Sequence, residues 1–216
     1  MTTQAMGIDN LRTDDPLLYP TRPPVDAATL DRVFRDAHTA HDFTDEPVTV
    51  DEIELIHDLV RFPPTAMNTQ PLRVILVTTP AAKERLQPLL AEGNRAKTAS
   101  APVTAILAAD TDFYEHLDRL VPHLPGARDR FLDDVAREKT ARFNATLQAG
   151  YFILAVRAAG LDAGPMGGFD AAGVDAEVFA GTGLRSFLAV NIGHASPEGV
   201  RPRAPRLERH EVVTVI

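Results

Sequence analysis

Residues 145–168, ATLQAGYFILAVRAAGLDAGPMGG, join a long apolar segment to a glycine-rich one. The apolar part ends a predicted helix over residues 129–159, and between 145 and 159 only Gln148 and Arg157 carry long polar side chains. A helix that is apolar on every side must be buried on every side. We therefore expect this helix either at the centre of the subunit or in a dimer interface, with Gly160 as its stop signal.

The flanking segments predict an α+β domain with helices around one mixed central sheet. Apolar, β-branched runs predict strands over 73–78, 103–109, 186–192 and 212–216. Asp26 can cap a helix whose buried face would hold Leu30, Val33, Phe34 and Ala37. Further helices are expected after a capping box formed by Thr49 and Glu52, with a core face of Ile53, Ile56, Leu59 and Val60, and over 80–92, where Pro88 should kink or shorten the helix. Residues 1–25 are interpreted as an extended arm before a single domain, 26–216.

Composition narrows the class of protein. The chain has 216 residues, no cysteine and a formal net charge of −8. The missing thiols exclude disulfides, thiolate metal sites and cysteine nucleophiles, so redox chemistry would need a cofactor. The negative charge argues against nucleic acid as a partner. No secretory signal and no apolar run of about 18 residues is recognised, so we expect no membrane span and a cytoplasmic location.

Five stretches could carry chemistry, and each also has a purely structural reading. Residues 64–71 are either a ligand-contacting loop or a turn between prolines, and 93–97 are either an amide and ammonium pair or a helix end. The glycines of 160–168 let a flat ligand approach the backbone or simply cap the helix, and they lack the spacing of a Rossmann motif or a P-loop. His38 and His41 have no third ligand for a metal, so we expect none. The arginines of 201–209 form either an anion site or a solvated arm.

In this order, the stretches resemble the nitroreductase family of FMN-dependent NAD(P)H oxidoreductases. Within it the sequence is most similar to the malonic semialdehyde reductase branch, through residues 93–94 with 97–98, 101–106, 113–115 with 122–123, and 160–170. The resemblance implies a nitroreductase-like three-layer sandwich and an obligate homodimer. FMN would lie in two clefts at the subunit interface, which would also account for the apolar helix.

The resemblance also implies a role for individual residues. The loop that borders the flavin, reaching it across the dimer, would be Pro64, Thr65, Ala66 and Asn68. Asn94 and Lys97 would meet the pyrimidine edge of the ring, and the backbone around its N5 atom would be that of Pro165, Met166, Gly167 and Gly168. The phosphate would be held by Arg203 and Arg206, together with the stretch His38, Thr39, Ala40 and His41.

Two positions depart from the family pattern. His38 begins the stretch where relatives usually carry arginine, and an imidazole with a pKa near 6.5 is mostly neutral at pH 7. FMN affinity should therefore fall as pH rises through the histidine pKa. Gly167 stands where many relatives carry a glutamate, so it offers no carboxylate and only its backbone could contact the flavin.

The implied activity is hydride transfer from NADH or NADPH, through flavin N5, to malonic semialdehyde, giving 3-hydroxypropionate. Arg73 or Arg95 could supply a cation for the substrate carboxylate. Three alternatives stay open: a broad nitro, quinone or enone reductase, a flavin-binding protein without turnover, and a purely structural dimer. No motif distinguishes NADH from NADPH.

Overall fold

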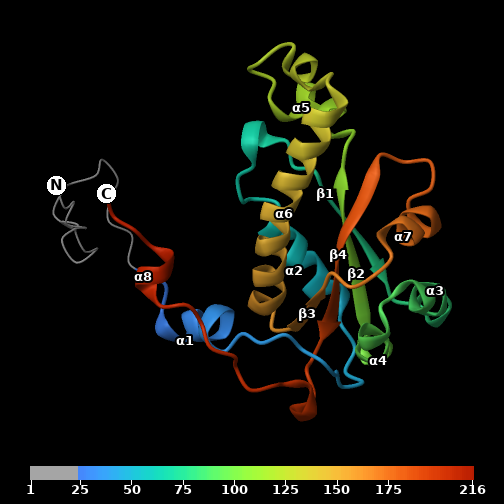
Figure 1. Cartoon of the computed structure of the whole chain (residues 1–216), viewed down its shortest axis with the longest axis vertical. Helices are drawn as coiled ribbons and strands as arrows, with labels where there is room; N and C mark the ends of the chain where they lie inside the picture. The colour runs from blue at the N-terminus through green and yellow to red at the C-terminus, as the bar shows by residue number, and fades with distance from the viewer. Residues whose placement is uncertain (1–23) are drawn as a thin grey trace.

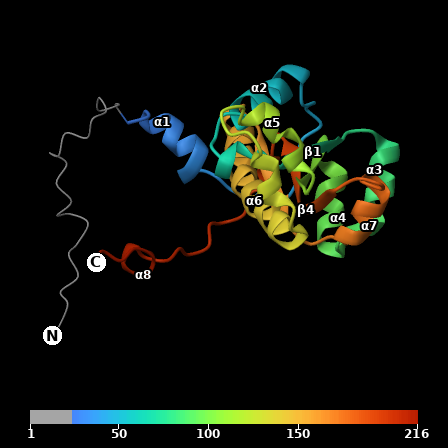
Figure 2. The ribbon, with the colours of Figure 1, turned by 90° about the horizontal axis from the view of Figure 1, so that it is seen from above.

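The computed structural model describes residues 24–216, so all but the last two positions of the expected N-terminal arm lie outside the described residues. Four strands form one sheet in the order β1-β2-β4-β3: β1 Leu72–Val77, β2 Val103–Asp110, β3 Asp162–Met166 and β4 Leu184–Gly193. Helices cover both faces, as Figures 1 and 2 show. The predicted three-layer α+β sandwich is confirmed.

The helical elements are α1 Ala27–Leu30, η2 Asp31–Arg35, α2 Val50–Val60, η3 Ala66–Asn68, α3 Pro80–Leu86, η4 Gln87–Leu89, α4 Glu92–Ser100, η5 Phe113–His116, α5 Leu117–Leu120, η6 Ala127–Phe131, α6 Asp134–Ala158, α7 Ala171–Val178, η7 Pro197–Gly199 and α8 Arg209–Val212. The capping box at the start of α2 is present, because the Thr49 hydroxyl accepts from the Glu52 amide and the Glu52 carboxylate from the Thr49 amide. The expected effect of Pro88 is also seen, since α3 gives way to the 3-10 turn η4 that contains it.

The described sheet is antiparallel throughout, so the expectation of a mixed sheet was wrong. Val77 at the end of β1 pairs with Thr104 at the start of β2, although α3 and α4 intervene. The chain therefore leaves β1 and enters β2 at the same edge of the sheet, so α3 and α4 form a long connection between two neighbouring antiparallel strands. Sequence periodicity identifies a strand but does not say in which direction its neighbour runs.

The two faces of the sheet are buried by different helices. Ala105 and Leu107 of β2 pack in the cluster that holds Ile56 of α2 and Phe152 of α6. Ile106 and Ala108 point to the opposite cluster, with Leu86 of α3. All eight residues of β2 are buried, as expected for a central strand covered on both sides.

The glycine-rich stretch contains a strand that the sequence did not predict. β3 follows α6 directly, and a Cβ atom at Gly164 would lie only 2.6 Å from the carbonyl oxygen of Ala40. The segment at Ala40 runs against this strand, since the Ala40 amide donates to the Ala163 carbonyl at 3.0 Å. Gly164 is therefore needed because it lets two backbone segments approach closely, and not because it forms a turn.

The ends of the described chain differ from prediction. No terminal strand forms over 212–216, because α8 ends at Val212 and the described residues offer the following segment no strand partner. The first helix buries no residue, and the Phe34 side chain is 56% exposed. Figure 2 shows α1 and α8 standing away from the sandwich, which explains why the apolar face of the first helix finds no core among residues 24–216.

Candidate functional site

A basic pocket of about 530 Å³ lies where the segment after η2, the C-terminal part of α6 and the C-terminal segment meet. Its cationic and imidazole side chains are Arg157, Arg201, Arg203, Arg206, His38 and His41. No acidic residue lines this pocket in the described chain. Four guanidinium groups without a carboxylate form a donor set suited to a phosphate dianion.

Arg203 ties the C-terminal segment to the first one. Its Nη2 atom donates to the carbonyls of Arg35 and Ala37 at 2.6 and 2.9 Å and lies 3.3 Å from His38 Nε2. Arg206 instead donates to carbonyls of its own segment, those of Ala204 and Pro205. The structure thus brings together the two stretches, 38–41 and 201–206, that are 160 residues apart in the sequence.

Arg157 is a pocket residue that the sequence analysis missed. It projects from α6 and donates from Nη2 to the His38 carbonyl at 3.4 Å. Burial lowers its pKa, the nearby Asp162 raises it, and Arg203 lowers it again. The one feature of the sequence that could have indicated its role is that a single arginine stands in an otherwise apolar part of the helix.

His41 links the pocket to α4. Burial lowers the pKa of this imidazole, and the positive charges of Arg201 and Lys97 lower it further. The pKa of Lys97 is itself lowered by burial and by Arg201. His41, Arg201 and Lys97 therefore share one electrostatic neighbourhood, in which the imidazole is held neutral at pH 7.

Asn94 and Lys97 lie on α4 beside the turn that follows β3. The Asn94 amide donates to the Gly168 carbonyl at 2.7 Å, and a Cβ atom at Gly168 would lie 2.8 Å from that nitrogen. Gly167 has open space where a Cβ would be. This turn therefore leaves its backbone accessible to a flat ligand.

A buried polar network underlies this part of α4. Asn191 donates to the Lys97 carbonyl at 3.1 Å and accepts from the Thr104 hydroxyl at 2.8 Å. Thr98 contacts the Met166 sulfur at 3.7 Å, which joins the helix to the end of β3, where Pro165 also lies. The predicted stretches 93–97 and 165–168 are thus brought together.

The loop 64–71 lies apart from these groups in the single chain. Its hydrogen bonds to other segments run to Asn144 of α6, to the Leu120 carbonyl, to Arg73 at the start of β1 and to the Asp110 amide of β2. No hydrogen bond found among residues 24–216 joins this loop to α4, the basic pocket or the turn after β3. Pro64, Thr65, Ala66 and Asn68 are therefore not assembled with the other predicted site residues within one subunit.

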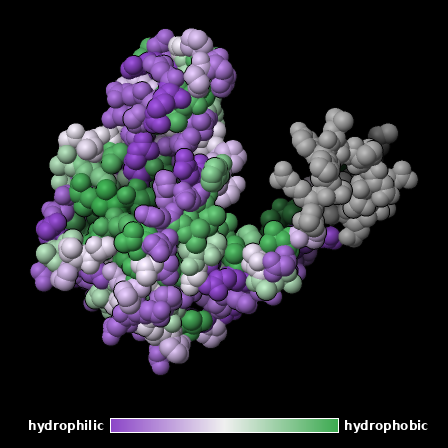
Figure 3. All heavy atoms as spheres, turned by 180° about the vertical axis from the view of Figure 1, so that it is seen from behind, coloured by the Kyte–Doolittle hydropathy of each residue, from purple (hydrophilic) through white to green (hydrophobic). Residues whose placement is uncertain are grey.

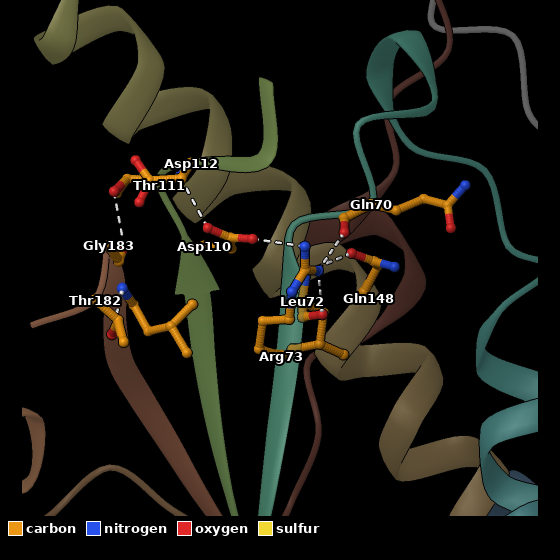
Figure 4. Close-up of polar contacts among 10 residues, drawn as sticks. Gln70, Leu72, Arg73, Asp110, Thr111, Asp112, Gln148, Thr182 and Gly183 are labelled. Carbon is orange, nitrogen blue, oxygen red and sulfur yellow. Dashed lines mark hydrogen bonds and ion pairs between the residues drawn. The ribbon is translucent and has the colours of Figure 1, made fainter. Parts of the chain in front are cut away.

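The two arginines considered for a substrate carboxylate already have partners. Arg73 pairs with the buried Asp110 at 2.6 Å and donates to the carbonyls of Gln70 and Leu72, as Figure 4 shows. Arg95 donates to the Leu90 carbonyl at 3.1 Å. Neither group is a free cation facing the turn after β3.

The sequence pattern of the nitroreductase family matches residues 34–194, a span that includes the first half of the basic pocket, α4 and β3. The chain belongs to the nitroreductase family. The nitroreductase fold accounts for the sandwich described above. The described part of this nitroreductase contains no helix that is both long and apolar enough to cross a membrane.

Individual relatives support this assignment. Proteins of Leptothrix cholodnii and Streptomyces griseus are 54% and 51% identical to this nitroreductase over 185 and 193 residues. These alignments cover 85% and 89% of this chain and 94% and 98% of the relatives, both named "Putative NADH dehydrogenase/NAD(P)H nitroreductase". A protein of Exiguobacterium sibiricum, solved in complex with FMN, shares the fold with a TM-score of 0.73 at 19% identity, over 90% of this chain and 99% of that one.

Proposed function

We propose that this nitroreductase binds FMN, takes hydride from NADH or NADPH and passes it to a small oxidised substrate. The observation that carries the proposal is the basic pocket: its lining, within residues 24–216, has four arginines and no acidic residue, and it lies close enough to α4 for Lys97 to lower the pKa of His41. The names of the relatives and the FMN complex of the Exiguobacterium sibiricum protein support the same activity.

The pocket residues would hold the FMN phosphate. Arg203 and Arg206 were expected there, with the stretch from His38 through Thr39 and Ala40 to His41. Arg157 and Arg201 add two guanidinium groups that compensate for the histidine in place of the usual arginine. Guanidinium groups donate charge-assisted hydrogen bonds to a phosphate, and these are stronger than hydrogen bonds between neutral groups.

The ring would lie between α4 and the turn after β3. When bound, FMN supplies the hydride-transfer chemistry. Asn94 would donate to the pyrimidine edge, and the Lys97 ammonium would stabilise negative charge that develops there. The backbone of Pro165, Met166, Gly167 and Gly168 would approach the ring around N5, and no side-chain base is required.

The loop 64–68 would reach the flavin of a second subunit, so the proposal includes a homodimer. Exposed apolar side chains support it: Phe143, Leu147 and Tyr151 recur every four residues on α6 and are 70%, 43% and 38% exposed. Figure 3 shows a further hydrophobic patch at mid-height of the face opposite to that of Figure 1, with mainly hydrophilic surface above and below it. Such contiguous apolar surface is typical of an interface.

For the substrate we propose malonic semialdehyde, reduced to 3-hydroxypropionate, on the strength of the branch resemblance that the segments between residues 93 and 170 carry in the sequence. A broad nitro, quinone or enone reductase is the second candidate, favoured by the nitroreductase names of relatives more than half identical. Turnover numbers for malonic semialdehyde, a nitroaromatic and a quinone, measured side by side with NADPH and NADH, separate the two. A cytoplasmic location stays a prediction.

The decisive experiment is to isolate the full chain, release its chromophore by heat and identify it by chromatography. We expect FMN, and anaerobic stopped-flow mixing with NADPH or NADH should bleach its visible absorbance. A yellow protein that neither nucleotide bleaches is a flavin-binding protein without turnover. A colourless protein that does not take up added FMN contradicts the proposal.

A further inference from the structure

Helix α6 presents two buried side-chain amides to the two ends of the loop 66–72. Asn144 is 2% exposed and accepts a hydrogen bond from the Ala66 amide at 2.8 Å. Gln148, 5% exposed, accepts one from the Leu72 amide at 3.0 Å. The two residues are four positions apart along the helix, so their side chains lie on the same face, about one turn apart.

The backbone between these two contacts is unusual. Met67, Asn68 and Gln70 have φ values of 51°, 52° and 42°, the left-handed region that residues other than glycine seldom adopt. Residues persist there only where the surrounding contacts determine the conformation. Three such residues in four positions therefore require firm anchors at both ends of the loop.

Further hydrogen bonds fix the loop from within and from β1. The Gln70 amide donates to the Thr65 hydroxyl at 3.1 Å. Arg73 donates to the Gln70 carbonyl at 2.9 Å, and its guanidinium is held in turn by Asp110. Figure 4 shows Gln148 and Arg73 on either side of the Leu72 backbone, one reaching it from α6 and the other from the sheet.

We propose that Asn144 and Gln148 are positioning residues that hold the loop 65–72 in its left-handed conformation before the flavin binds. This inference rests on the proposed function, in which the same loop borders FMN. A loop that is already ordered adds little entropic cost to binding, so the amides on α6 would raise FMN affinity without touching the cofactor. Arg157, further along α6, lines the basic pocket, so one rigid helix supports both parts of the binding machinery.

The test compares wild-type protein with Asn144→Leu and Gln148→Met, which keep a side chain of similar length and shape but remove the acceptor oxygen. Hydrogen–deuterium exchange of the FMN-free protein should be faster in peptides that cover 64–72. The Kd for FMN should rise by about tenfold in each variant, the effect expected from leaving one buried amide unpaired. Gln148→Glu keeps an acceptor oxygen, and we expect it to restore slow exchange and tight binding.

Val156→Ala is the matched control, because Val156 is fully buried on the same helix and packs in the sheet core. It should lower Tm while leaving exchange in 64–72 and the Kd unchanged. Equal weakening of FMN binding by Val156→Ala, or unchanged exchange in both amide variants, overturns the positioning role alone. If Asn144→Leu fails to fold, the Gln148→Met and Gln148→Glu pair decides. A wild-type protein that binds no FMN overturns the proposed function instead. The two failures are distinguishable, because this one is measured on the wild-type protein and the other on the variants.

Discussion

At the scale of single residues, the site depends on how charge is distributed around His41. Burial and two neighbouring cations lower its pKa, so the imidazole is neutral at pH 7 in the free protein. An anion in the pocket favours the protonated form, and binding and protonation then reinforce each other. His41 can therefore strengthen the phosphate site, but only on the acid side.

We predict that FMN affinity of the wild-type protein, relative to His41→Gln, falls as pH rises from about 5 to 7. The phosphate of FMN titrates in the same range, but it does so with both proteins, so the ratio of their Kd values isolates the imidazole. Fluorescence titration of FMN at several pH values measures it. A ratio that does not change with pH would contradict the coupling, and His57→Gln on the exposed face of α2 serves as a control.

Lys97 gives a second prediction at this scale. We expect Lys97→Gln to slow reduction of bound FMN by NADPH by about tenfold or more, because a fixed charge that stabilises the reduced ring is lost. Stopped-flow absorbance at saturating NADPH provides the rate. Lys139→Gln removes an exposed cation from α6 and should leave the rate unchanged; an equal loss in both variants would argue against a local role for Lys97.

At the scale of elements, β3 matters because it supports the segment that carries the phosphate stretch. The carbonyl of Ala40 approaches Gly164 so closely that any side chain there must displace it. The stretch 38–41 is thus held by backbone contact to a strand rather than by its own secondary structure. This explains how a segment without helix or strand presents His38 and His41 at a fixed place.

We predict that Gly164→Ala lowers the free energy of unfolding by about 1–3 kcal/mol and weakens FMN binding, because the new methyl group pushes the Ala40 segment away. Urea denaturation at fixed protomer concentration measures the stability. Gly93→Ala meets nothing within 4 Å and should be neutral or slightly stabilising in helix α4. Equal stability of the Gly164→Ala and wild-type proteins would show that the segment can move away freely.

At the scale of the whole molecule, α6 connects the fold to the proposed assembly. One side of it packs on the sheet through Ala149 and Phe152, while Phe143 and Leu147 face outward. The first helix and α8 also extend beyond the sandwich in Figure 2. Within residues 24–216, a single subunit therefore leaves apolar surface uncovered and the loop 64–68 apart from the basic pocket.

We predict that Leu147→Asp converts a dimer into monomers, since a buried unpaired carboxylate opposes association. Light scattering after size-exclusion chromatography measures the mass, and the monomer should also lose FMN because each cleft would lack the partner's loop. Ala81→Asp, exposed on α3 across the sheet, should stay dimeric and yellow. A wild-type protein that elutes as a monomer with FMN bound would contradict the shared cleft.

Local pattern was enough to predict those features that short-range physics controls. The capping box at Thr49 and the end of α3 before Pro88 depend on neighbours within about one helical turn. So do the interior strand, expected over 103–109 and found over 103–110, and the long helix, expected over 129–159 and found over 134–158. The sequence also placed Asn94, Lys97, Gly168 and the C-terminal arginines among the candidate residues. The stretches in their order were sufficient to identify the family.

Contacts between distant segments decided everything else. Strand direction, the existence of β3 and the exposure of Phe34 depend on which surfaces meet, and no local periodicity encodes that. Arg157 lines the pocket because the fold places the C-terminal part of α6 beside His38. Arg73 is not available to a substrate carboxylate because the fold pairs it with Asp110. The sequence by itself determined the elements and the kinds of side chain. Only the tertiary structure decided which of these side chains share a pocket, because electrostatic and hydrogen-bond energies depend on distances in space and not on separation along the chain.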